Sequence, residues 1–201
     1  MPRSALIAMI ILVTGIAAGT LWYVGDQFAS HRINMTSVGD TKIGGPFSLT
    51  DQNGRTRTDK DFIGHYMLVY FGYTNCPDVC PTTLSVMADA MEKLGGAAHQ
   101  VVPIFVTVDP ARDTPRVLKS YLAAFGPEFV GLTGSPSSIA ALAKEYHVYY
   151  KVQKSTKNGS YAVDHSNVIY LMGPEGKFIA NYDETLGPDK LAAAIARHIG
   201  A

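Results

Sequence analysis

One segment constrains the fold more than any other: an apolar strand followed directly by an amphipathic helix. Residues Tyr66–Tyr73 form an almost unbroken apolar run, typical of a strand buried on both faces. From Cys80 to Leu94 apolar residues recur at helical spacing, Pro81 suits a first-turn position, and two glycines follow. A strand and helix joined in this way predict a parallel sheet covered by helices.

The rest of the chain continues this alternation of strands and helices. The segment 131–134, which begins and ends with glycine, is interpreted as a break between secondary-structure elements. A parallel core with an antiparallel edge is the order of the thioredoxin fold, so we predict an α/β domain of that class. The patterns predict strands at 46–50, 101–108, 148–152, 167–172 and 177–182, and helices at 115–125, 136–146 and 188–199.

The amino-terminal segment predicts a transmembrane helix. Ala5–Val24 contains no charged residue, and a helix of that length would span about 30 Å, the thickness of the hydrocarbon core. Arg3 precedes the segment and Asp26 follows it, so the positive-inside rule places the amino terminus in the cytoplasm. The alternative is a cleaved signal peptide, because Ala17-Ala18-Gly19 is an acceptable cleavage site.

These observations suggest a division of the chain and a location. We expect a membrane anchor at 1–25, a linker at 26–45 and a thioredoxin-like domain at 46–201. The short amino terminus lacks an Arg- and Ser-rich presequence, which favours a bacterial inner membrane with the soluble domain in the periplasm. The chain has 17 basic and 17 acidic side chains and no long basic run, which argues against nucleic acid as a partner.

Two cysteines lie where the buried strand ends and the helix begins. Three residues separate Cys76 from Cys80, so both sulfurs would lie together at the helix N-terminus. The helix dipole and free N–H groups stabilise thiolate there, and thiolate is both a nucleophile and a metal ligand. A plain disulfide bond is the alternative, because an exported chain faces an oxidising compartment, although closing so short a loop stabilises little.

A histidine occupies the position that should face this pair. Thioredoxin oxidoreductases have two residues between their cysteines and a cis-proline loop opposite them. Here no proline occurs between Lys151 and Gly173, where that loop should lie. His165 lies there instead, just before the strand predicted at 167–172. His165 would bring one nitrogen to the two sulfurs, and such a donor set suits Cu(I). Histidines are more often surface or core residues, but the position in the fold favours a ligand.

Three blocks of the sequence carry a family resemblance. The segments 71–81 (FGYTNCPDVCP), 108–115 (VDPARDTP) and 163–166 (VDHS) resemble the signature blocks of the SCO/SenC copper chaperones. The resemblance covers roughly residues 40–200 and includes a preceding membrane anchor. It implies a non-enzymatic metallochaperone that helps metallate the binuclear copper site of cytochrome c oxidase. Cys76, Cys80 and His165 match the family's copper ligands.

The resemblance also implies a cargo and partners. We expect copper as Cu(I), with binding of Cu(II) left open. The expected partners are the copper-accepting oxidase subunit, a thioredoxin-like reductant that keeps the cysteines reduced, and another periplasmic copper chaperone. The alternative function is a thiol–disulfide oxidoreductase, in which Cys76 attacks and Cys80 resolves.

Acidic residues near the site have weaker assignments. Asp78, between the cysteines, would tune their pKa values or simply favour the helix start. Asp164 would orient His165 or belong to a turn. We expect Asp109, Arg112 and Asp113 to brace the loop beneath the site.

Overall fold

The computed structural model describes residues 42–153 and 161–200, which belong to one compact unit. The predicted anchor and most of the predicted linker lie outside the described residues. Within the described ranges, no helix has the length and apolar character needed to cross a membrane.

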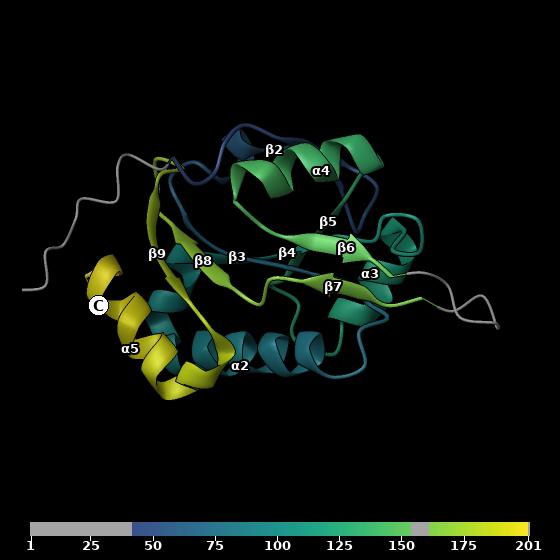
Figure 1. Ribbon diagram of the computed structural model, residues 1–201. Coiled ribbons are helices and arrows are strands. Elements are labelled where there is room, and N and C mark those ends of the chain that lie inside the picture. Colours follow the sequence, from purple (N-terminus) through teal and green to yellow (C-terminus); the bar gives the residue numbers. More distant parts are fainter. Residues whose placement is uncertain (1–41, 154–160, 201) are drawn as a thin grey trace, which may run out of the picture. The chain divides into compact units, whose positions relative to one another are not determined.

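A seven-stranded mixed sheet forms the centre of this unit (Figure 1). Its strand order is β2-β1-β5-β4-β3-β8-β9. The three central strands β5, β4 and β3 run parallel, and antiparallel hairpins form both edges. The strands are β1 (Ser48–Asp51), β2 (Thr56–Thr58), β3 (Tyr66–Gly72), β4 (Val101–Thr107), β5 (Val130–Thr133), β8 (Ile169–Met172) and β9 (Phe178–Tyr182).

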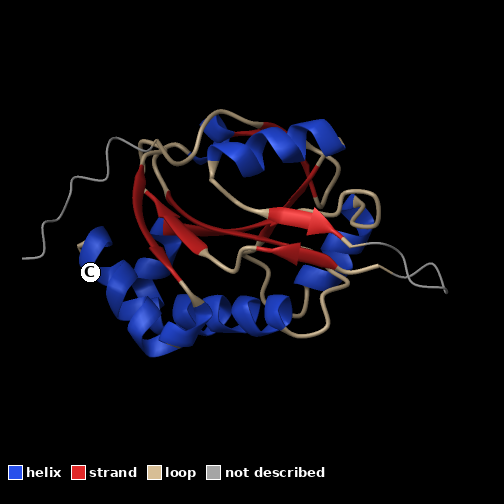
Figure 2. Ribbon diagram, in the orientation of Figure 1, coloured by secondary structure: helices blue, strands red, loops and turns tan. Residues whose placement is uncertain are grey.

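Helices cover both faces of the sheet (Figure 2). Helices α2 (Val79–Leu94) and α5 (Pro188–Ile199) pack together on one face, and α4 (Pro136–Glu145) lies across the other. Helix α3 (Pro115–Leu122) packs on β5. The described residues also include three short 3-10 helices that were not predicted from the sequence: Asp59–Phe62, Gly95–Gln100 and Glu184–Leu186.

The predicted strand–helix unit is confirmed. Along α2 the buried side chains include Leu84, Met87 and Met91, the helical spacing that the sequence shows. Gly95 follows the helix with φ of 53°, a value that favours glycine. The parallel core with an antiparallel edge is also present, so the structure has the predicted thioredoxin-like α/β class.

The prediction of a break between elements at 131–134 is wrong, because Val130–Thr133 is strand β5 within the sheet. Gly131 allows helix α3 to pack closely on this strand. A Cβ at that position would lie 2.5 Å from Leu122 Cδ1 and 3.3 Å from Leu118 Cβ, so its absence lets α3 approach the strand. Helix α3 is also shorter than predicted and ends at Leu122.

A second, two-stranded sheet carries the histidine. Strand β6 (Tyr150–Val152) pairs antiparallel with β7 (Val163–His165), and His165 lies opposite Tyr150. The sequence predicted the first of these strands but not the second. The small sheet is separate from the seven-stranded sheet in its hydrogen bonding.

Candidate metal centre

The two cysteines lie on the connection from β3 to α2. Cys76 is in the loop and is partly buried, whereas Cys80 is in the first turn of α2 and is 0% exposed. The Cys76 amide donates to the Tyr73 carbonyl at 3.2 Å, which closes the loop. The Cys80 amide donates to Cys76 Sγ at 3.5 Å, so an N–H group of the helix start does point at a sulfur. Both residues are free thiols.

Gly72, the last residue of β3, makes room for the buried sulfur. A Cβ at this position would lie 2.8 Å from Cys80 Sγ and 2.9 Å from Phe105 Cε2. Any side chain there would displace the sulfur or the ring. No role of this glycine was predicted from the sequence, and the Phe-Gly-Tyr step directly before the cysteine loop is the signal that indicates it.

His165 approaches the pair from the small sheet. Its Nε2 lies 3.3 Å from Cys80 Sγ, and its Nδ1 lies 3.0 Å from the Ser166 carbonyl oxygen. A carbonyl can only accept, so Nδ1 carries the proton and the lone pair of Nε2 faces the sulfur. The Tyr73 ring packs edge-on against the imidazole at 5.8 Å between centroids. One ligand atom from each of Cys76, Cys80 and His165 lies within 4.8 Å of the others.

The two thiols have opposite electrostatic environments. Burial works to raise the pKa of Cys76, but the main-chain N–H groups around its sulfur outweigh it and lower the pKa below the ordinary value. Burial raises the pKa of Cys80 to about 12. Burial also lowers the pKa of His165, which keeps the imidazole neutral and able to coordinate. The centre therefore offers one accessible, activated thiol and one buried thiol.

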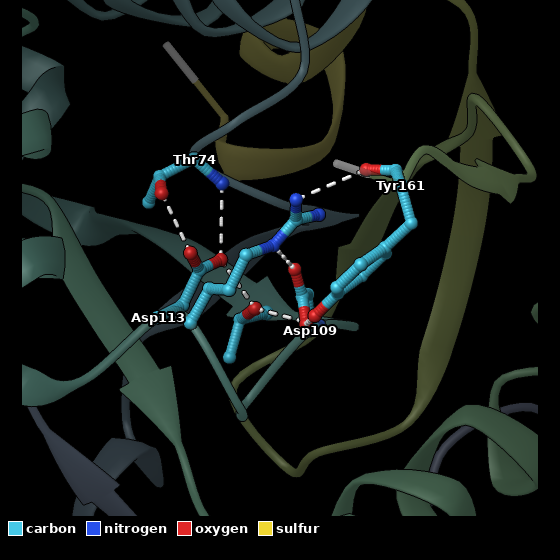
Figure 3. Close-up of polar contacts among 6 residues, drawn as sticks. Thr74, Asp109, Asp113 and Tyr161 are labelled. Atoms are coloured by element: carbon cyan, nitrogen blue, oxygen red, sulfur yellow. Dashed lines mark hydrogen bonds and ion pairs between the residues drawn. The ribbon is translucent and has the colours of Figure 1, made fainter. Parts of the chain in front are cut away.

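A polar network that includes Thr74, Asp109 and Asp113 braces the loop before the cysteines, as expected (Figure 3). Asp113 accepts hydrogen bonds from the Thr74 amide at 3.0 Å, from Thr74 Oγ1 at 2.6 Å and from Thr107 Oγ1 at 2.6 Å. These bonds fix the start of the cysteine loop to the end of β4. The carboxyl is buried, and burial raises the pKa of Asp113.

The same network reaches the histidine segment. Arg112 forms an ion pair with the buried Asp109 and donates to the Tyr161 carbonyl at 3.0 Å. Its guanidinium carbon lies 3.7 Å from the centre of the Tyr161 ring, and the Tyr161 hydroxyl donates to Asp109 at 2.8 Å. Tyr161 leads into β7, so a single loop, 107–113, contacts both segments that carry candidate ligands.

The two other acidic candidates lie on the surface. The side chain of Asp78 is exposed and makes no capping hydrogen bond, although the residue occupies the N-cap of α2. Asp164 is exposed and accepts from Gln153 across the small sheet. Asp164 therefore lies on the face of β7 away from the sulfurs, since side chains alternate along a strand.

Comparison with known proteins identifies the family. The family model described as SCO1/SenC matches residues 35–200. This chain belongs to the SCO1/SenC family. Protein SenC of Rhodobacter capsulatus is 39% identical over 196 residues, covering 96% of this chain and 88% of SenC. The mitochondrial SCO1 homolog of Mus musculus is 39% identical over 165 residues, which cover 81% of this chain but 58% of the mouse protein. The chain thus spans well under two thirds of the mouse relative's length.

Solved structures of SCO1/SenC proteins share the fold. ScoI of Bradyrhizobium japonicum, solved with copper bound, is 46% identical, with a TM-score of 0.73 over 77% of this chain and 98% of ScoI. BsSco, described as a member of the Sco family of cytochrome c oxidase assembly proteins, is 26% identical, with a TM-score of 0.62 over 79% of this chain and 94% of BsSco. A SCO1/SenC lipoprotein of Bacillus anthracis is 25% identical, with a TM-score of 0.68 over 80% of this chain and 94% of that protein.

Proposed function

We propose that this SCO1/SenC protein binds one copper ion as cargo and delivers it to the copper-accepting subunit of cytochrome c oxidase. Cys76, Cys80 and His165 are the proposed ligands. The observation that carries the proposal is their convergence, with three ligand atoms within 4.8 Å of one another. Two thiolates and a neutral imidazole suit Cu(I), and we propose Cu(II) only as a second bound form to be tested.

The environment of the three ligands supports transfer rather than permanent storage. Cys80 is buried, and a hydrogen bond to the Ser166 carbonyl sets the tautomer of His165 that presents Nε2 to the sulfurs. Cys76 is partly exposed, so an incoming thiol can reach a metal bound there. Ligand exchange between thiols then moves the metal to a partner without a catalysed chemical step, and the protein is not an enzyme in this role.

An anaerobic Cu(I) titration against a competing chelator tests the proposal. We expect one copper per full-length chain, abolished by Cys76→Ser or Cys80→Ala and weakened at least about tenfold by His165→Ala, since loss of one ligand removes about 1.4 kcal/mol or more. His65→Ala is the matched control, because His65 is exposed and precedes β3, at the opposite end of that strand from the cysteines. Wild-type affinity in His165→Ala would remove this residue from the ligand set.

A thiol–disulfide reductase is the second candidate, and the asymmetry of the two thiols favours it. The Cys76 thiolate would attack a partner disulfide, forming a mixed disulfide and releasing one partner thiolate. Cys80 would then lose its proton and attack the Cys76 sulfur, closing the Cys76–Cys80 disulfide and releasing the second partner thiol. Over the two steps the partner disulfide gains two electrons and the cysteine pair loses two. Brisk insulin reduction that requires both cysteines would favour this function over delivery.

The remaining proposals concern placement and partners. We place the chain in a bacterial inner membrane, with residues 1–25 as anchor, 26–45 as linker and the copper domain from 46 onward in the periplasm. In that oxidising compartment the cysteines need a thioredoxin-like reductant before they can hold copper. Another periplasmic copper chaperone is the proposed source of the metal. Asp78 and Asp164 are proposed as outer residues with small effects on the site, since both side chains are exposed.

A further inference from the structure

The hydroxyl of Tyr70 is buried and forms no hydrogen bond of normal geometry, although Thr83 and the Cys80 sulfur are its polar neighbours. Tyr70 lies in β3, and its side chain is 0% exposed. Within the described part of the chain, its oxygen has no hydrogen-bond partner. A buried hydroxyl without a partner is destabilising. Tyr121 and Tyr182 carry such hydroxyls too, but of these three rings only that of Tyr70 meets the His165 ring. The group therefore points to a partner that is present in another state of the site.

The nearest candidate partner is the sulfur of Cys80. A Cβ at Gly72 would lie 2.8 Å from Cys80 Sγ and 3.1 Å from Tyr70 Cε1, so the sulfur and the phenol ring lie side by side over that glycine. The Tyr70 ring also meets the His165 ring edge-on at 6.2 Å between centroids. Burial raises the pKa of the phenol, and the neighbouring Cys80 sulfur raises it further, so the hydroxyl keeps its proton.

The state of the sulfur decides whether this hydroxyl has an acceptor. A protonated thiol is a weak acceptor, whereas a thiolate is a strong one. Copper binding requires the thiolate. Resting on the copper site proposed above, we propose that the Tyr70 hydroxyl donates a hydrogen bond to Cys80 Sγ when that sulfur is a copper-bound thiolate.

Such a bond would bias the oxidation state of the cargo. A hydrogen bond to a ligating sulfur withdraws electron density from it, and hydrogen bonding around a cysteine sulfur tunes the potential of copper sites. Cu(II) needs more donation from sulfur than Cu(I) does. Tyr70 is therefore a positioning residue that favours retention of Cu(I).

The test compares the full-length wild type with Tyr70→Phe, which keeps the ring and its packing. Each is titrated separately with Cu(I) and Cu(II) against chelators. We expect both to bind one copper, and the ratio of Cu(I) to Cu(II) affinity to fall about tenfold in Tyr70→Phe. In the Cu(II) form, resonance Raman bands of the Cu–S stretch should shift less in D₂O for Tyr70→Phe than for the wild type, because one exchangeable donor to sulfur is gone.

Two control variants make the result specific. Tyr182→Phe removes another hydroxyl without a partner, in the edge strand β9 and with Arg197 as its charged neighbour, and should change neither the ratio nor the D₂O shift. Thr83→Val removes a second hydroxyl near the Cys80 sulfur, which donates to the Val79 carbonyl at 2.9 Å and lies 3.1 Å from Asn167 Oδ1. It should retain the wild-type D₂O shift.

The outcomes separate this inference from the proposed function. A Tyr70→Phe protein that binds copper with an unchanged affinity ratio and an unchanged D₂O shift overturns the hydrogen bond and leaves the copper site intact. Loss of the shift in Thr83→Val but not in Tyr70→Phe assigns the donor to Thr83 and also overturns it. A wild type that binds no copper overturns both.

Discussion

The two segments that carry the proposed ligands are held in different ways. Cys76 and Cys80 lie between a central strand, β3, and the long helix α2, so regular main-chain hydrogen bonds hold them on both sides. His165 ends a three-residue strand in a separate two-stranded sheet. Side-chain contacts tie its segment to the rest of the domain, chiefly Arg112 with the Tyr161 carbonyl and ring.

This difference indicates which ligand can move during transfer. A buried strand and helix open only with much of the domain, whereas a short outer sheet opens locally at lower free energy. The sulfurs therefore keep their positions while the imidazole is the ligand best able to leave and return. Substitutions on the two sides should accordingly affect different properties.

The largest effect on stability is expected from Asp113→Ala, on the cysteine side. The change removes the acceptor for the Thr74 amide and for two hydroxyls, and should lower the free energy of unfolding by about 3 kcal/mol. Because burial raises the pKa of Asp113, its removal also relieves a desolvation cost, so the loss is less than the sum of three bonds. Urea unfolding measures it.

Asp183→Ala is the matched control for this change. Asp183 is exposed and accepts from the Thr185 amide at 2.9 Å, so its loss should lower stability by about 1 kcal/mol or less. An Asp113→Ala protein no less stable than this control would contradict the view that the carboxylate holds the cysteine loop.

A smaller effect is expected from Arg112→Lys, on the histidine side. Lysine keeps the charge beside Asp109 but loses the planar fork that also reaches Tyr161, so we expect a loss of about 1–2 kcal/mol. The diagnostic result is local. Amide hydrogen exchange should accelerate in Val163–His165, while the amide of Cys76 keeps its wild-type rate.

Arg116→Lys, at an exposed position on α3, should leave both rates unchanged and controls for the substitution itself. Equal acceleration in the cysteine loop and in β7 would mean that Arg112 stabilises the domain as a whole. The proposed difference between the two segments would then be wrong.

Local patterns predicted the cysteine side almost completely. Residues 66–94 contain all the signals for this side: the apolar run of β3, the helical spacing of α2, and Cys76 and Cys80 where the strand ends and the helix begins. The position of His165 required the fold order as well, because 85 residues separate it from Cys80. Its approach to the sulfurs is confirmed, whereas its role as a ligand stays a prediction.

Features that depend on packing could not be predicted from the sequence. Gly131 looked like a turn residue because nothing local shows that α3 packs over it. Gly72 and the unpartnered hydroxyl of Tyr70 acquire meaning only when Cys80 is placed beside them. A bracing role for Asp113 was expected, but its partner Thr74 lies 39 residues away and no sequence spacing indicates that pairing.

The smallest expected effects lie within the cysteine side itself, where the two thiols differ. In the metal-free protein, iodoacetamide should alkylate Cys76 with an apparent pKa below the ordinary value of a thiol, since main-chain N–H groups stabilise its thiolate. Cys80, buried and with its pKa raised to about 12, should stay unmodified over the same pH range. Mass spectrometry of the alkylated peptides distinguishes the two.

Asp78→Asn should move this apparent pKa by less than about half a unit, and downward, because an exposed carboxylate is well screened and its removal slightly favours thiolate. The hydrogen bonds that lower the pKa of Cys76 come from the main chain of residues 78–80 and survive the substitution. Cys76→Ser provides the unreactive control. A shift of a full unit would instead show that the Asp78 side chain acts directly on the sulfur, and the cysteine loop would then depend on a replaceable side chain as the histidine segment does.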